Sequence, residues 1–300
     1  TAVGSSSAAN TTTGENNTAI GSTSLLVNTT GSHNTAVGTD ALRVNSTASY
    51  NTAVGKDAMK NNSTGTRNTA VGALTLDSNS TGDDNTALGQ FAMSANTTGE
   101  DNTAVGTNCL DANTTGVRNT AIGMNTLSAN TTANNNTALG QGSMFANTTG
   151  TDNTAVGKSS LDANTSGNNN TAVGKDALGA NTTGTENTAV GMNAAATINT
   201  GNYNTAIGRR ALYSASSCSN NVAIGRSCME DATSQAEQNV CIGNVAGFAL
   251  RSDYNVAVGY EALKTSTTGA ANTAIGYEAL ENTNSSNNTA CGFRSLINST

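Results

Sequence analysis

A short pattern of apolar and polar residues, Asn-Thr-Ala-Val-Gly, recurs along the whole chain. Its glycine returns every 17 residues from Gly4 to Gly225, and four further copies follow at steps of 16 to 18 residues. The eighteen copies cover the 300 residues. A fixed period of this length is typical of a solenoid, in which each coil buries its apolar side only by stacking on its neighbours. We therefore predict one continuous domain over 1–300.

Each copy is numbered here from its Asn as position one, so that 102–118 reads NTAVGTNCLDANTTGVR. β-Branched residues at positions two and four, followed by glycine, predict a short strand closed by a turn with positive φ. A second short strand is expected around positions eight and nine. No window of about ten residues has helical periodicity. The pattern predicts an all-β fold, a parallel β-solenoid or β-roll of about eighteen 17-residue coils.

Two positions have the apolar character expected of a core. Position four is Val, Ile or Leu in every copy except the last, which has Cys291, and position nine is Leu or Met in fifteen of eighteen copies. We expect both to point inward. Position two shares a strand face with position four and exchanges Thr with Val, so it should lie at least partly inside.

Position three should then point outward, yet it is Ala in seventeen copies and Cys241 in the other. An outward position that stays small is best explained by another surface packed against it, which for identical chains is a symmetry mate. The interchain contact candidates are Ala104, Ala121, Ala138 and Ala155. Close strand packing within one chain is the alternative. Two apolar strips per coil make a thin core, which also favours a homo-oligomer.

The unit, and more so its late variants Asn-Val-Ala-Ile-Gly at 221–225 and Asn-Val-Ala-Val-Gly at 255–259, resembles the head repeat of the YadA-like trimeric autotransporter adhesins. The resemblance covers the whole chain. It implies a left-handed parallel β-roll with three chains side by side, serving as an extracellular head, fibre or stalk at the cell surface. The unit here is longer than is usual in that family, and the extra residues fall in the Asn-Thr-Thr-Gly segment.

That segment carries an Asn-x-Ser/Thr sequon in each of the first eleven copies. Read as outer loops, these sequons predict a line of N-linked glycans along one edge. Asn and Thr are also good turn residues, which is the structural alternative. The regular sequon-bearing coils span 1–191, and 192–300 are less regular and could form a capping or contact end. The glycosylation candidates are Asn10, Asn28, Asn45, Asn62, Asn79, Asn96, Asn113, Asn130, Asn147, Asn164 and Asn181.

The Asn at position one is nearly universal. Stacked copies at one corner of the coil would form an amide ladder, bonded to the coils above and below. We expect this row to have a structural role.

Composition and charge narrow the function classes. The chain has 13 Lys and Arg against 20 Asp and Glu, a net charge of −7, which argues against nucleic acid as a partner. No apolar run approaches the roughly 18 residues of a membrane span. The only histidine, His33, cannot form a metal cluster alone, and no acidic pair recurs, so we expect no cofactor, no metal and no enzymatic activity.

Five cysteines are too few for a disulfide framework. Four of them replace small or apolar residues of the repeat and fit a core role. Cys218 departs from this rule, because it stands where the loop usually has Gly. It could pair with Cys228 or Cys241 in an oxidising compartment, and the sequence does not choose between the two.

These patterns predict a structural, extracellular repeat protein that forms a segment of a fibre, filament or surface adhesin and associates with copies of itself. Two alternatives remain open. A regular solenoid with Thr in every coil could bind ice through ranks of hydroxyls, and a phage or viral tail fibre would share the trimeric assembly.

Overall fold

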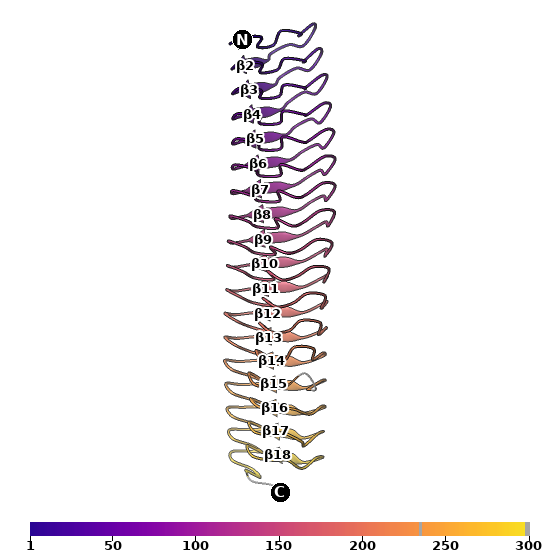
Figure 1. Cartoon of the computed structure of the whole chain (residues 1–300). Coiled ribbons are helices and arrows are strands. Elements are labelled where there is room, and N and C mark those ends of the chain that lie inside the picture. The colour runs from indigo at the N-terminus through magenta and orange to yellow at the C-terminus, as the bar shows by residue number, and fades with distance from the viewer. Residues whose placement is uncertain (234–235, 298–300) are drawn as a thin grey trace. The chain divides into compact units, whose positions relative to one another are not determined.

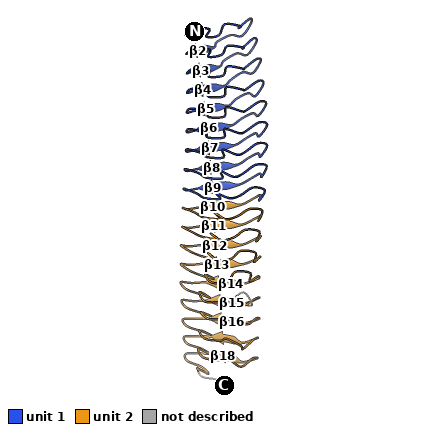
Figure 2. Ribbon diagram, in the orientation of Figure 1, with its two compact units in different colours: residues 1–151 blue, residues 152–300 orange. Residues whose placement is uncertain are grey.

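The computed structural model describes residues 1–233 and 236–297, in two compact units, Thr1–Thr151 and Asp152–Thr300 (Figure 2). The described residues contain no helix. In each unit the coils repeat with the period seen in the sequence, and each coil contributes one short strand (Figure 1).

The strands occupy positions two to four of each copy. Eighteen lie within the described residues: β1 Ala2–Val3, β2 Thr18–Ile20, β3 Thr35–Val37, β4 Thr52–Val54, β5 Thr69–Val71, β6 Thr86–Leu88, β7 Thr103–Val105, β8 Thr120–Ile122, β9 Thr137–Leu139, β10 Thr154–Val156, β11 Thr171–Val173, β12 Thr188–Val190, β13 Thr205–Ile207, β14 Val222–Ile224, β15 Val240–Ile242, β16 Val256–Val258, β17 Thr273–Ile275 and β18 Thr289–Cys291.

Within each unit, every strand pairs in parallel with the strands of the neighbouring coils. The register opposes equal positions, so that Thr103 lies beside Thr120 and Ala104 beside Ala121. Because this register is kept from strand to strand, each of the three strand positions forms a row of like side chains. The prediction of an all-β parallel β-solenoid with one 17-residue copy per coil is confirmed.

The part of the coil after the strand is a series of turns. Positions seven and nine take left-handed backbone conformations, as at Asn108 (φ 51°) and Leu110 (φ 52°). These angles interrupt an extended chain, so the second strand expected around positions eight and nine is absent from the described coils, and that prediction was wrong. The turns still bond to the next coil, since the Leu110 N–H donates to the Thr126 carbonyl at 3.0 Å.

The glycine at position five closes the strand. Gly106 has φ +138°, and a Cβ there would lie 2.3 Å from the carbonyl oxygen of Gly123 in the next coil. Both the backbone angle and the close approach of the neighbouring coil exclude a side chain. This explains why the glycine occurs in every copy.

The interior of each coil is narrow and partly polar. Its fully buried residues include the Ala of position three, the small residue of position eight, the Leu or Met of position nine, and Asn at positions one and twelve. In the coil of 102–118 these are Ala104, Cys109, Leu110, Asn102 and Asn113. Position nine was correctly placed in the core.

Candidate functional site

The exposed face of the strands is the most regular surface of each unit. It consists of the outward Thr row, position two, and the outward Val row, position four, which holds Val, Ile or Leu. In β8, Ile122 is 41% exposed, whereas its neighbour Ala121 is fully buried. The strand therefore turns its small residue inward and its large apolar residue outward.

This orientation corrects two predictions. Position four is not a core row, and Ala104, Ala121, Ala138 and Ala155 cannot contact another chain, because all four are fully buried inside their own coil. The prediction that positions three and four point to opposite faces of the strand was correct, but the inward and outward faces were exchanged. The physical reason is space: the inner strand face looks across a narrow coil toward the Leu row and the Asn rows, and only a small side chain fits there. The alternative of packing within one chain was the correct one.

The outward face carries no charge. Positions two and four contain only Thr, Val, Ile, Leu and a single Cys in all eighteen copies. The Thr hydroxyls of this face, such as that of Thr103, make no hydrogen bond to the protein within the described residues. By contrast, Thr97 at position thirteen donates its hydroxyl to the Thr114 carbonyl at 3.0 Å. The hydroxyls of the outward Thr row are thus free to meet a partner or solvent.

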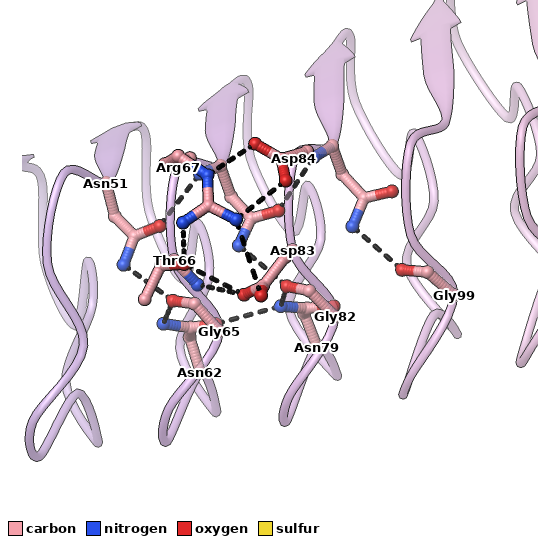
Figure 3. Close-up of polar contacts among 12 residues, drawn as sticks. Asn51, Asn62, Gly65, Thr66, Arg67, Asn79, Gly82, Asp83, Asp84 and Gly99 are labelled. Carbon is pink, nitrogen blue, oxygen red and sulfur yellow. Dashed lines mark hydrogen bonds and ion pairs between the residues drawn. The ribbon is translucent and has the colours of Figure 1, made fainter.

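The Asn residues of position one form the predicted ladder. The side-chain oxygen of Asn51 accepts the backbone N–H of Asn68 in the next coil at 2.9 Å, and its Nδ2 donates to the Gly65 carbonyl at 2.8 Å (Figure 3). The first bond satisfies a buried N–H that the strand ladder leaves unpaired. The structural role expected for this row is confirmed.

A second ladder is formed by Asn at position twelve, the position of ten of the eleven sequons. The Nδ2 of Asn79 donates to Asn62 Oδ1 at 2.8 Å and to the Gly82 carbonyl at 3.0 Å (Figure 3). The ten side chains are all fully buried: Asn28, Asn45, Asn62, Asn79, Asn96, Asn113, Asn130, Asn147, Asn164 and Asn181.

The buried ladder contradicts a line of glycans at these ten positions. An N-linked sugar is attached at Nδ2, which here points into the coil and donates two hydrogen bonds, and a glycan could not pass through the wall. Of the predicted sites only Asn10 is exposed. Later coils support an interior role, because position twelve becomes Ile198, Ala215 and Leu250, which are also buried. That exchange of Asn for apolar residues was the signal in the sequence.

Charged and aromatic side chains lie elsewhere, mainly on the turns. The Arg67 guanidinium forms a two-pronged ion pair with Asp84 one coil on, with Nε–Oδ1 2.6 Å and Nη2–Oδ2 2.8 Å (Figure 3). The hydrogen bond from Arg67 lowers the pKa of the Asp84 carboxyl. At the same position two coils earlier, His33 stacks on Tyr50 with ring centroids 5.0 Å apart. These contacts link neighbouring coils.

The cysteines are free thiols, and Cys109, Cys218, Cys228 and Cys241 are buried. Cys218 lies next to Asn204, with its thiol 3.9 Å from Asn204 Oδ1. Among the described residues, no contact joins Cys218 to Cys228 or Cys241, its two expected partners. The structure brings Cys228 and Cys241 together instead, because the Cys228 thiol donates to the Cys241 carbonyl at 3.2 Å.

Within 1–233 and 236–297, no group of three or more His, Cys, Asp or Glu side chains could hold a metal ion. The same residues include no helix with the length and apolar character of a membrane span.

No family model matches the chain, and no curated protein is significantly similar to it. The class of protein is therefore defined by the fold: a repeat protein of the parallel β-solenoid type.

Proposed function

We propose that this chain is a structural segment of an extracellular fibre or surface adhesin, and that copies associate side by side through the outward Thr and Val rows. One observation carries the proposal: in every strand of β2–β9 the large apolar residue faces out and alanine faces in. Stable monomers rarely leave a long apolar stripe uncovered, and such stripes mark interaction surfaces.

A second copy of the same chain fits this face best. Its coils have the same spacing, about 4.8 Å, so equivalent rows can meet coil after coil without losing register. A partner whose repeat has a different spacing would lose this register after a few coils. The absence of charge at positions two and four removes the repulsion that like-charged identical faces would have. Three copies and a left-handed coil are what the resemblance to YadA-like heads implies.

The free hydroxyls of the outward Thr row favour a second candidate function, binding to a crystalline surface such as ice. In-register strands repeat these hydroxyls once per coil, next to apolar side chains. A monomer with this face exposed would then cause thermal hysteresis. If the chain were instead part of a viral or phage tail fibre, it would self-associate through the same outward face. Glycosylation is proposed only for Asn10, which is exposed.

Matched variants of the full chain test the proposal. In the first, Val71→Glu, Leu88→Glu and Val105→Glu place three charges on the outward Val row of β5–β7. In the second, Ala73→Glu, Gln90→Glu and Thr107→Glu place three charges at position six of the same coils. Light scattering should show that the first variant dissociates and the second retains the mass of the unmodified chain. Equal behaviour of the two would exclude the outward face as the contact.

A further inference from the structure

The seam between the coils of β14 and β15 contains a buried pair of thiols. Cys228 follows β14 at position eight, and Cys241 is the central residue of β15. Both side chains are fully buried. The Cys228 thiol donates to the Cys241 carbonyl at 3.2 Å, so the two residues lie in direct contact across adjacent coils.

The sequence makes room for this pair. Cys241 is the single exception in the inward Ala row, and the same coil has Gly247, the single glycine in the Leu row. A Cβ at Gly247 would lie 2.6 Å from Cys241 Sγ and 3.4 Å from Met229 Cγ. The sulfur of Cys241 therefore occupies space that a leucine takes in other coils. A larger residue at position three is accompanied by a smaller one at position nine.

The pair also lies where the repeat is irregular. The step from Gly225 to Gly243 is 18 residues instead of 17, so this coil carries one extra residue. A covalent link here would join a long coil to the next one.

We propose that Cys228 and Cys241 form a disulfide that joins these two coils when the chain folds under oxidising conditions. A small-molecule disulfide is the oxidant. The thiolate of one cysteine attacks it, which gives a mixed disulfide and releases one small-molecule thiol. The thiolate of the second cysteine then attacks the mixed disulfide, which gives the Cys228–Cys241 bond and releases the second small-molecule thiol. The two cysteines lose two electrons and two protons, and the oxidant becomes two thiols. This inference does not depend on the proposed self-association.

Burial determines when the reaction can take place. The hydrogen bond with Cys228, together with burial, holds the pKa of the Cys241 thiol well above its usual range. The reactive thiolate is therefore scarce in the closed coil. We expect the bond to form during folding or local opening, and to form slowly in the folded protein.

Peptide mapping of the full chain tests the inference. The denatured chain is refolded with oxidised and reduced glutathione, alkylated, and cut after Arg, Lys and Glu. Because Arg226, Glu230, Glu237 and Arg251 flank the two cysteines, 227–230 and 238–251 become separate peptides. We expect them to be linked in the oxidised sample, and the link to disappear after reduction.

Two thiols of the chain serve as controls. Cys109 also occupies position eight, but the next coil has Ala121 opposite, so Cys109 should be alkylated in every sample. The variant Cys218→Ser should keep the linked peptides, and Cys228→Ser should lose them. Complete alkylation of Cys228 and Cys241 in the refolded wild-type chain would overturn the inference, as would a bond from either residue to Cys218.

Discussion

Ala121 and Ile122 are neighbours in β8 and lie on opposite sides of the coil wall, with Ala121 fully buried and Ile122 41% exposed. In an isolated chain, burying the side chain of Ile122 would stabilise the fold more than burying that of Ala121, because isoleucine has the larger apolar surface. The inverted arrangement repeats from coil to coil. It makes the interior narrow and leaves the larger apolar surface for an external contact.

Enlarging the inner residue should damage the coil more than changing the outer one. Ala121→Leu would overpack the space beside Leu127 and the Asn rows, at a cost of about 1–3 kcal/mol in the free energy of unfolding. Ile122→Leu keeps volume and should cost less. Hydrogen exchange should increase near β8 in the first variant only. Equal protection in both variants would mean that the inside and outside assignments are wrong.

The first Asn ladder should be sensitive to the loss of a single amide. Asn102→Ala removes the acceptor of the buried Asn119 N–H. The Gly116 carbonyl also loses a donor, but it still accepts from Asn113 Nδ2 at 3.1 Å. The orphaned Asn119 N–H is expected to cost about 1–3 kcal/mol. Thr103→Ala, on the outward face of β7 in the same coil, serves as the control for chain stability. Thermal melting should separate the two variants clearly, and similar melting temperatures would argue against the ladder.

The sequons at position twelve should remain unmodified in folded protein. When the chain is secreted from a host with N-glycosylation, mass spectrometry of peptides with Asn96, Asn113 and Asn130 should find bare asparagine, because these amides are buried in the second ladder. Asn10 is the exposed comparison within the same chain. Native, correctly folded material with sugars at the buried positions would contradict the ladder.

Asp111 should reduce stability at neutral pH. Its Oδ1 is buried without a hydrogen-bond partner, and desolvation raises the pKa of this half-buried carboxyl. A raised folded pKa means that stability is greatest below the unfolded pKa and falls as pH rises through the folded pKa. Asp111→Ser, which restores the residue found at Ser94 and Ser128, should raise the melting temperature at pH 7. The gain in stability is expected to be below about 1 kcal/mol, because solvent screens the group.

At pH 3 the difference between Asp111→Ser and the unmodified chain should shrink, because the carboxyl is then largely protonated in both folded and unfolded states. Asp84→Ser is the control with the opposite sign, since the pKa of Asp84 is lowered by its hydrogen bond with Arg67. That variant should bring no gain at pH 7. A stabilisation by Asp111→Ser that is equal at both pH values would exclude titration as the cause.

The solenoid fold could be predicted from the sequence because the 17-residue period determines how the coils stack. Seventeen-residue spacing with a strand motif in each copy leaves parallel stacking as the one arrangement that pairs every strand. The Asn ladder at position one followed from the same register. Side-chain orientation was harder, since Ala and Val differ in size and the rule that larger apolar residues face inward points the wrong way here.

The sequons show a second limit of sequence reasoning. The sequence Asn-x-Thr is compatible with a glycosylation site, with a turn and with a buried Asn ladder. Only the burial of the Asn side chain distinguishes these three roles. The exchange of Asn for Ile198 and Leu250 at position twelve indicates an interior row. The left-handed angles of Asn108 and Leu110 had no comparable signal, because leucine seldom takes such a conformation.

The mass of the unmodified chain in solution tests the central claim most directly. Static light scattering, measured over a range of concentrations, should give a mass of at least twice 29.9 kDa, and three times that value if the assembly is the trimer that the resemblance implies. A monomer of 29.9 kDa that stays folded at every concentration would contradict self-association through the outward face. The Thr and Val rows would then be open to solvent, and thermal hysteresis of that monomer would favour the ice-binding function.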